Sequence, residues 1–221
     1  MKNSTSKLVF KHPHFKRWKK RLEENGIVFK NIEVLSVISR DNIRLLVAFL
    51  DCVILTPEGD EIPRCVLIGD DSVVIVPVLT CRDDGEIYTM MVEQRRVIDG
   101  GMAFEFPAGG LEGGVDLKAV ACQELQEELQ LAVTPDELIP LAEDALRIDP
   151  SWSGELAYFF YFQREVSLEF LQNMDGRVTG IPEDHEHLRI KVLKMSEVAN
   201  QLTSSAIIGI KLLEKSLKRI F

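Results

Sequence analysis

The sequence predicts an α/β fold, an α/β/α sandwich with a mixed sheet that is preceded by a small β-rich section. The first observation is the order of elements, in which strand-like apolar runs enclose one short helix and another helix closes the chain. The second is a composition, 46% hydrophobic and 28% charged over 221 residues, that is ordinary for one globular domain with a small extension. We therefore expect a basic helix or extension at 1–25, a β-sheet section at 26–68 and the main domain at 69–221.

The N-terminal extension is strongly basic. Residues 1–21 hold eight of the 26 Lys and Arg residues and no Asp or Glu, which leaves 18 basic and 35 acidic residues in the rest of the chain. An acidic body argues against nucleic-acid binding. The segment around Phe15, Trp18 and Leu22 is typical of an amphipathic helix. We interpret it as a surface helix docked by its aromatic side chains; the alternatives are contact with an acidic partner subunit and an organellar targeting segment.

Apolar and β-branched runs predict the strands. Turn signals at 40–42 and 57–60 separate the first three of them and favour hairpins. The run Val73–Leu79 is continuously apolar, as expected of a strand buried on both faces. The predicted strands are Ile27–Ser39, Ile43–Thr56, Ile62–Ile68, Val73–Leu79, Ile87–Gln94, Leu156–Phe162 and Leu188–Leu193.

Other segments favour helices. Residues 117–129 place apolar side chains three and four positions apart. Val166–Asn173 is helix-like, and a helix opening at Ser204 is expected to run to about Arg219 with basic residues in its last turn. Thr134-Pro-Asp-Glu has the pattern of a capping box that a short helix at most follows. No stretch approaches the ~20 apolar residues that would cross a bilayer, so no membrane contact is expected.

The helix expected at 117–129 carries three glutamates that suggest a metal site. Its apolar stripe consists of Leu117, Ala121, Leu125 and Leu129. Glu128 points into this stripe, and Glu124 and Glu127 lie along its edge. A carboxylate aimed at a core is costly unless it is paired or binds a cation. The three acids suit a hard divalent ion, Mg²⁺ or alternatively Mn²⁺; a solvated acidic helix face is the other interpretation.

The four cysteines, at positions 52, 65, 81 and 122, indicate neither a zinc site nor a disulfide framework, because none of them are in C-x-x-C spacing. No apolar segment typical of a signal peptide lies near the start. Free cysteines fit a reducing compartment, and we expect a cytoplasmic protein.

The stretch Glu105–Leu131, EFPAGGLEGGVDLKAVACQELQEELQL, resembles the Nudix hydrolase signature G-x5-E-x7-R-E-U-x-E-E-x-G-U, in which U is a bulky aliphatic residue. Six of its nine positions match, namely Gly109, Glu124, Leu125, Glu127, Glu128 and Leu131. The E-x-x-E-E core, which holds the metal in this family, is therefore complete.

Val115, Gln123 and Gln130 depart from the signature, where the family has Glu, Arg and Gly. In the family that the sequence resembles, this Glu and this Arg are similar to a salt-bridged pair. Both are replaced here by uncharged residues, so neither substitution leaves a charge without its partner. Asp116 is expected to cap the helix instead. Gln130, if it adopts the left-handed conformation, costs about 1 kcal/mol relative to Gly.

Three other segments resemble ADP-ribose and ADP-sugar diphosphatases of this family, in the same order. Glu93–Arg96 followed by EFPAG resembles their EQ-x-R…E-[LMF]-PAG run, and PSWSGE at 150–155 stands where they have a substrate loop. Gly180–Arg189 resembles their acidic loop with a late catalytic Glu. The insert Glu169–Arg177 favours the ADP-sugar branch, and the resemblance covers roughly 43–215.

The resemblance implies metal-dependent hydrolysis of the pyrophosphate bond of a nucleoside diphosphate sugar, of the ADP-ribose or ADP-glucose type, to a nucleoside monophosphate and a sugar 1-phosphate. The implied metal ligands are the Ala108 carbonyl oxygen and the carboxylates of Glu124, Glu127 and Glu128, with Glu124 also counted as catalytic. A bound divalent ion neutralises the diphosphate and lowers the pKa of a bound water.

The resemblance also assigns the remaining roles. Glu186 is the implied general base, and the fallbacks on the same loop are Asp184 and Glu183; His185 and His187 flank it. Arg96 is expected to hold a phosphate, or Arg95 in its place, since strand neighbours face opposite ways. A surface ion pair at the end of the strand is the alternative for Arg96. Trp152 is expected either to stack on a base or sugar or to pack internally. Glu155 is expected to contact the substrate or the metal.

Two other functions remain open on the sequence. The altered signature also fits a catalytically impaired Nudix-fold protein that binds a nucleotide in a regulatory role. A Nudix hydrolase of another diphosphate, such as GDP-mannose, a dinucleotide or capped RNA, is the third interpretation. The resemblance further implies a homodimer formed through the sheet section at 26–68.

Overall fold

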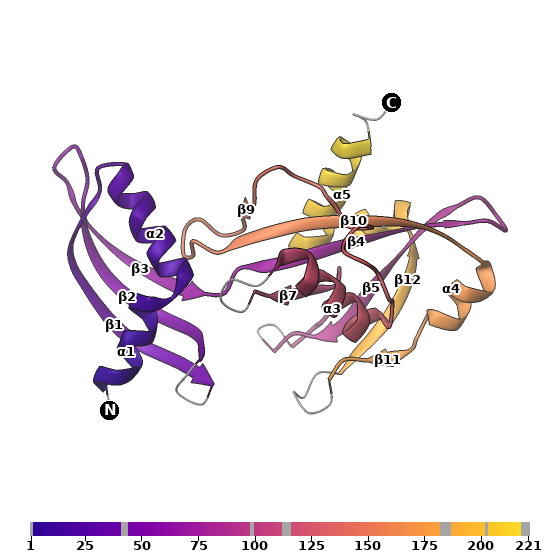
Figure 1. Cartoon of the computed structure of the whole chain (residues 1–221), viewed down its shortest axis with the longest axis horizontal. Helices are drawn as coiled ribbons and strands as arrows, with labels where there is room; N and C mark the ends of the chain where they lie inside the picture. The colour runs from indigo at the N-terminus through magenta and orange to yellow at the C-terminus, as the bar shows by residue number, and fades with distance from the viewer. Residues whose placement is uncertain are drawn as a thin grey trace. The chain divides into compact units, whose positions relative to one another are not determined.

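The computed structural model describes residues 2–40, 44–97, 100–111, 116–181, 187–201 and 203–217. The chain divides into two compact units, each assembled from three segments (Figure 1). The first unit comprises Met1–Ser72, Gly110–Gly114 and Leu146–Ala157, and the second comprises Val73–Gly109, Val115–Ala145 and Tyr158–Phe221.

A three-stranded antiparallel sheet forms the centre of the first unit. Its order is β1 (Val28–Arg40), β2 (Arg44–Leu55) and β3 (Glu61–Gly69). The two long strands pair from Val28 opposite Leu55 to Arg40 opposite Arg44. The three strands predicted before residue 69 are therefore confirmed, each to within two residues at either end.

Two helices pack on this sheet, α1 (Lys2–Lys11) and α2 (Pro13–Glu24). The second begins with Pro13 in its first turn, where proline lacks only an N–H that would be unpaired in any case. It confirms the amphipathic helix predicted around Trp18. The first lies within the predicted helix or extension at 1–25 but was not distinguished as a separate helix, because its opening turns are polar.

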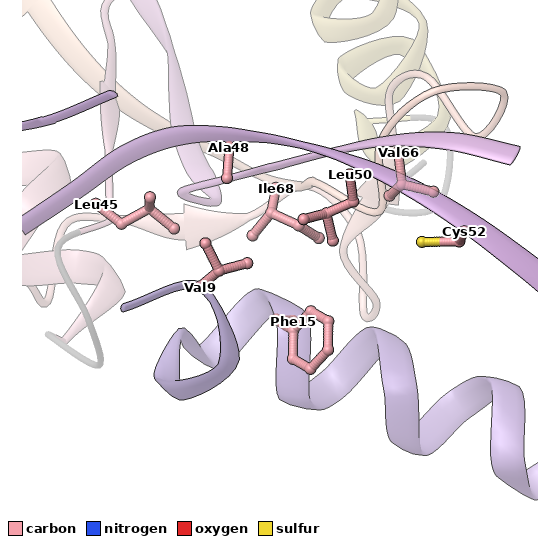
Figure 2. Close-up of a cluster of buried hydrophobic side chains, with 8 residues drawn as sticks. All are labelled: Val9, Phe15, Leu45, Ala48, Leu50, Cys52, Val66 and Ile68. Atoms are coloured by element: carbon pink, nitrogen blue, oxygen red, sulfur yellow. The ribbon is translucent and has the colours of Figure 1, made fainter. Parts of the chain in front are cut away.

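The core of the first unit lies between these helices and the sheet (Figure 2). Its buried members are Val9, Phe15, Leu45, Ala48, Leu50, Cys52, Val66 and Ile68. Trp18 packs against this cluster and stands edge-on to Phe15 and Phe29, with ring centroids 5.8 and 5.1 Å apart. The basic helix is thus docked by its aromatic side chains, as expected.

The second unit is built on a sheet of order β11-β12-β5-β4-β10-β8, with β6 on β5 and β7 on β4. The strand bounds are β4 (Ser72–Cys81), β5 (Ile87–Arg95), β6 (Met102–Glu105), β7 (Ala108–Gly110), β8 (Ile139–Pro140), β10 (Leu156–Val166), β11 (Val178–Thr179) and β12 (Leu188–Lys194). The start of β10 belongs to the first unit and pairs there with β9 (Leu146–Arg147). The central strand β4 is buried along nearly its whole length, which explains its unbroken apolar sequence.

Three α-helices accompany this sheet, α3 (Leu117–Leu129), α4 (Leu168–Met174) and α5 (Ser204–Leu217), together with a 3₁₀ helix, η2 (Met195–Asn200). α3 and α5 lie on opposite sides of the sheet (Figure 1), which confirms the predicted α/β/α sandwich. α5 approaches closely at Gly209, where a Cβ would lie 2.8 Å from the ring of the fully buried Phe106 and 3.1 Å from Val76.

Two segments with predicted helix signals fold differently from the prediction. β10 extends to Val166, and α4 begins only at Leu168 because the Ser167 hydroxyl caps it by accepting the Phe170 N–H at 3.1 Å. Glu137 accepts hydrogen bonds from the Thr134 N–H and hydroxyl, but the segment closes as a turn without a helix. None of the helices in the described ranges has the length and apolarity that a bilayer-spanning helix requires.

Candidate active site

Helix α3 carries the three candidate acids and is fixed at both ends. At its start the Asp116 carboxylate accepts the Lys118 N–H at 3.1 Å, as the sequence predicted for this cap. At its end Gln130 adopts the left-handed conformation, with φ 55° and ψ 32°. The Leu131 N–H then bonds back to the Leu125 carbonyl at 3.0 Å, which satisfies one of the last carbonyls of the helix.

Glu128 is buried in the second unit, with 4% of its surface exposed. Its Oε2 accepts the Ala108 N–H at 3.0 Å, which ties the helix to the turn that precedes it by 20 residues. Its backbone carbonyl accepts the Thr179 hydroxyl at 2.6 Å. The prediction that this acid points into the apolar stripe is confirmed, and the hydrogen bond offsets part of the cost of burying a carboxylate.

Glu124 lies directly against the backbone of Gly109. A Cβ built on Gly109 would stand 1.8 Å from Glu124 Oε1 and 2.1 Å from its Cδ. No side chain fits there, so a glycine at this point is what allows the carboxylate to reach the turn. Glu124 and Glu128 therefore meet the Ala108–Gly109 turn from the same helix.

Glu127 is positioned by a neighbour on its own helix. The Gln123 side chain donates a hydrogen bond of 2.9 Å from Nε2 to Glu127 Oε1. The Glu127 carbonyl accepts the Gly180 N–H at 3.4 Å, so the segment that leads into residues 182–186 starts beside the end of α3.

The predicted phosphate contacts, Arg95 and Arg96, lie at the end of β5, Arg95 as its last residue and Arg96 directly after it. Arg96 forms an ion pair with Glu105 through Nη2, and its Nε lies 3.3 Å from the second carboxylate oxygen. Gln94 donates to the same carboxylate at 2.9 Å. Arg95 donates to the Gly100 carbonyl at 2.7 Å. An incoming phosphate at Arg96 would therefore compete with Glu105.

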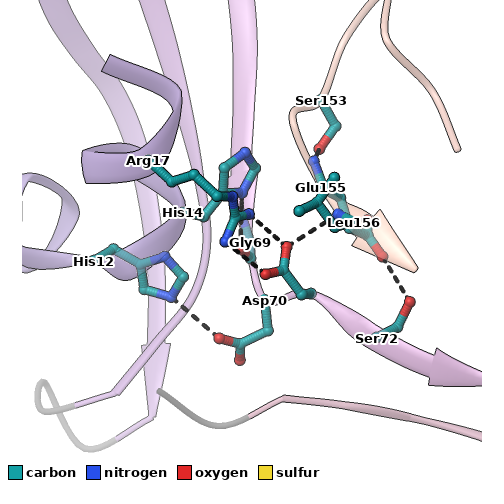
Figure 3. Close-up of polar contacts among 10 residues, drawn as sticks. His12, His14, Arg17, Gly69, Asp70, Ser72, Ser153, Glu155 and Leu156 are labelled. Atoms are coloured by element: carbon teal, nitrogen blue, oxygen red, sulfur yellow. Dashed lines mark hydrogen bonds and ion pairs between the residues drawn. The ribbon is translucent and has the colours of Figure 1, made fainter. Parts of the chain in front are cut away.

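Trp152 and Glu155 lie in the first unit. Trp152 is 55% exposed and stands edge-on to Phe49, with ring centroids 6.4 Å apart, while its carbonyl accepts the Leu67 N–H. Glu155 accepts the Ser72 hydroxyl at 3.3 Å (Figure 3), and burial raises the pKa of its carboxyl. The indole face thus remains accessible, whereas the Glu155 carboxylate is partly withdrawn from solvent.

The loop that carries these two residues is tied to helix α2 through Asp71. Arg17 binds Asp71 with both guanidinium nitrogens at 2.7 Å, and Asp71 Oδ1 also accepts the Leu156 N–H at 3.0 Å (Figure 3). A bidentate Arg–carboxylate pair fixes direction as well as charge. Helix α2 therefore helps to place the end of the 146–157 loop.

Two histidines complete this polar cluster. His12 Nε2 lies 3.1 Å from Asp70 Oδ1, and His14 Nδ1 lies 2.9 Å from the Gly69 carbonyl oxygen. His14 is buried, and a Cβ on Gly154 would lie 2.7 Å from its Nε2. Sequence reasoning missed these contacts because the paired residues are 54 to 85 positions apart in the chain.

A family model described as the NUDIX domain matches residues 71–213 of this chain. The chain belongs to the Nudix family. Nudix hydrolase 14, chloroplastic, from Arabidopsis thaliana is similar at 26% identity over 200 residues, an alignment that covers 83% of this chain. The chain spans 64% of the length of that relative.

A solved structure described as an ADP compounds hydrolase has the same Nudix fold. It superposes with a TM-score of 0.60 at 14% identity, covering 87% of this chain and 94% of its own. At this identity the likeness concerns the fold alone.

Nudix hydrolases generally use divalent metal ions, and α3 can be judged against that requirement. Glu124, Glu128 and the half-buried Ala108 offer oxygen donors at one turn, the donor type that hard cations prefer. Among the described residues, however, no three Asp, Glu, His or Cys side chains are spaced to hold an ion. The donors therefore fit such a cation in chemical type, and Glu127, whose Oε1 accepts the Gln123 hydrogen bond, could join them through its second carboxylate oxygen.

Several signature and loop residues of this Nudix chain lie outside the described ranges. They are Val115, Glu183, Asp184, His185 and Glu186. His187 is described and exposed. The predicted general base and its fallbacks thus stay predictions. Of the signature departures, Gln123 forms a hydrogen bond to Glu127, and Gln130 adopts the strained conformation expected of it.

Proposed function

We propose that this Nudix protein hydrolyses the pyrophosphate bond of a nucleoside diphosphate sugar of the ADP-ribose or ADP-glucose type, giving a nucleoside monophosphate and a sugar phosphate. The observation that carries the proposal is the placement of the E-x-x-E-E acids, with Glu128 bound to the Ala108 N–H and Glu124 seated on Gly109. The sequence motifs that resemble those of ADP-ribose and ADP-sugar diphosphatases support this substrate class.

The proposed metal ligands are the carboxylates of Glu124, Glu127 and Glu128 with the Ala108 carbonyl, and the proposed ion is Mg²⁺, with Mn²⁺ as the alternative. A bound divalent ion supplies charge neutralisation at the diphosphate and a water of lowered pKa. Burial of Glu128 favours this role, since an acid held beside a core gains most from a cation.

The proposed general base is Glu186, with Asp184 and Glu183 as fallbacks, and it would take the proton from the attacking water. The Gly180 N–H bond to the Glu127 carbonyl supports this assignment, because it starts the acidic loop next to the metal helix.

Arg96 is proposed to bind a substrate phosphate by exchanging its partner Glu105 for it, and Arg95 is the alternative. Trp152, a residue that is more than half exposed, is proposed to stack on the base or sugar. Glu155 is proposed to contact the substrate near Trp152.

A regulatory nucleotide-binding protein is the second candidate. The observation in its favour is the hydrogen bond that Gln123 donates to Glu127, one of the proposed metal ligands. Gln123 stands at the position where the family signature has Arg. Such a protein would bind a nucleotide sugar without turnover.

The deciding experiment is a product assay on ADP-ribose, ADP-glucose, GDP-mannose and UDP-glucose, with Mg²⁺, with Mn²⁺ and with EDTA. Metal-dependent release of AMP from an ADP-sugar is expected, and Glu128→Gln should lower kcat by at least about 100-fold, since metal catalysis supplies several kcal/mol of barrier lowering. The exposed Glu169→Gln on α4 is the control and should leave kcat unchanged. Tight binding without turnover would support the regulatory candidate instead.

We also propose a homodimer formed through the β1–β3 sheet. Several apolar side chains on its strands are exposed, namely Val28, Leu35, Ile38 and Leu46. Light scattering should give twice the 25.0 kDa chain mass, and Ile38→Glu should shift it to the monomer. Ile87→Glu, at an exposed apolar position of the second unit, is the control; equal loss in both variants would contradict the proposed interface.

A further inference from the structure

A hollow of about 420 Å³ opens in the first unit between the two helices and the edge strand β1. Its apolar part consists of Phe10, Phe15, Phe29 and Ile32. Phe10 is 42% exposed although its ring stands edge-on to Phe15 at 5.1 Å. An aromatic surface that is rigid on one side and open on the other is a feature of ligand sites more than of a finished core.

The polar part of the same hollow is basic. It consists of Lys16, Lys19 and Lys20 from one side of α2, together with Glu23. Lys19 lies 3.6 Å from Glu23, and Lys20 pairs with Glu24 at 3.7 Å, both as exposed pairs of the kind that contribute little. Lys16 has no ion-pair partner within the described part of the chain. Positive charge at this edge is therefore available to a ligand.

The lining also limits the kind of ligand. Among the described residues that line it, there is no Ser, Thr, Asn, Gln or His side chain that could read the edges of a nucleobase. Its volume is that of a small-molecule site, which lies in the range of about 300–1,000 Å³. A ligand with an apolar body and one anionic group would match both the phenylalanines and the three lysines of the lining.

We propose that this hollow binds a soluble single-chain anionic amphiphile, with its apolar body on the phenylalanines and its carboxylate or phosphate group on Lys16, Lys19 and Lys20. This gives the basic N-terminal segment a binding function that is independent of the proposed hydrolysis. Apolar contact supplies most of the attraction, and the lysines select the sign of the head group.

Decyl phosphate below its micelle concentration is the probe, with decanol and decyltrimethylammonium as neutral and cationic counterparts. Trp18 stands 5.1 Å from Phe29 and reports binding by fluorescence in the full chain with Trp152→Phe, which leaves it the single tryptophan. Saturable binding of one decyl phosphate per chain is expected, with decanol at least tenfold weaker. Calorimetry on the unmodified chain gives the stoichiometry.

The test variant is Lys16→Ala/Lys19→Ala/Lys20→Ala, expected to weaken decyl phosphate binding at least tenfold and decanol binding little. The matched control removes the same charge outside the hollow, at Lys7, Lys11 and Lys30, and should leave both affinities unchanged. Phe10→Glu places an acid at a lining position that is already exposed. It should also abolish binding while leaving the melting temperature unchanged.

Several outcomes of the binding experiments would overturn the proposal. They are decanol binding as tightly as decyl phosphate, equal losses in the test and control triples, and the absence of saturation. Binding to vesicles of anionic phospholipid without binding of the soluble probe would likewise overturn it and indicate a membrane-facing surface.

Discussion

At Gly109 a hydrogen atom stands where any other residue would place a carbon 1.8 Å from the Glu124 carboxylate. A similar close approach occurs at Gly154, where a Cβ would contact Nε2 of the buried His14, an atom without a hydrogen-bond partner among the described residues. In both places the glycine has no Cβ, so a polar side chain can approach the backbone closely, and the glycine is not required for a turn. Sequence alone shows the glycines of a signature, but not which carboxylate or imidazole they admit.

Gly109→Ala is expected to reduce metal-dependent turnover by about 100-fold, because Glu124 must swing away and a shift of about 1 Å in a catalytic group has that scale of effect. The melting temperature should change little, since the end of a partly exposed side chain can yield. Steady-state kinetics and thermal melts measure the two effects. Gly110→Ala is the control, because its Cβ would meet only Asp70 Cβ at 3.9 Å. Equal turnover in both variants would contradict the role given to Gly109.

Protonation of His14 is expected to destabilise the first unit in acid. Burial lowers the pKa of His14 below its ordinary 6.5, an effect that the Gly69 carbonyl partly opposes and Arg17 reinforces. The unfolded chain therefore binds the proton first, so the free energy of unfolding falls as the pH drops through 6.5, by at most about 1.4 kcal/mol per pH unit. Below the folded pKa the loss levels off.

Urea unfolding at pH 7.5 and 5.5 measures this dependence. His14→Gln should remove that part of the slope, whereas the exposed His187→Gln should keep it. An unchanged slope in His14→Gln would show that other groups carry the pH dependence.

Helix α3 shows how an element can keep its geometry while its signature changes. Asp116 caps its start and the bonds to Gln126 and Leu125 close its end, so the acids keep their places although Gln130 replaces the family's glycine. Long elements such as this one could be predicted because periodic burial marks them. Strands of two to four residues, β6 to β9 and β11, could not, since pairing with a neighbour decides them rather than their own sequence.

Gln130→Gly is expected to stabilise the protein by about 1 kcal/mol, because glycine adopts a φ of 55° without the strain of a side chain. The hydrogen bond from Arg177 to Gln130 that it removes is exposed and 3.3 Å long, so its loss should offset little. Chemical denaturation measures the gain. Gln126→Gly, within the same helix, should instead destabilise the protein by a similar amount. A loss of stability in both variants would contradict the backbone strain assigned to Gln130.

For the molecule as a whole, fold class and family could be predicted because four motifs stand in order along the chain. The contacts that join α2 to Asp70, Asp71 and Leu156 could not, since they arise only once distant segments meet. Arg96 illustrates the same limit: its type and position fitted either a phosphate ligand or a surface ion pair, and only the fold shows that its ion-pair partner is Glu105.

Divalent ions are expected to stabilise the whole molecule if the acids bind them as proposed. A ligand that binds only the folded state at 100 times its Kd adds about 2.7 kcal/mol, so saturating Mn²⁺ should raise the melting temperature by several degrees. EDTA should reverse the shift. Glu124→Gln should abolish it, while Glu169→Gln should preserve it. The same Mn²⁺ shift in both variants would place the ion elsewhere.

The first unit is drawn from three separated stretches of chain, and this limits how such a protein can be rearranged by recombination. A single crossover at the start of the family match would carry Asp71 into a new context without Arg17, and would part Leu67 from the Trp152 carbonyl. An exchange that kept these pairs together would have to transfer three gene fragments at once. The two units are therefore expected to be inherited together, because the chain passes between them more than once.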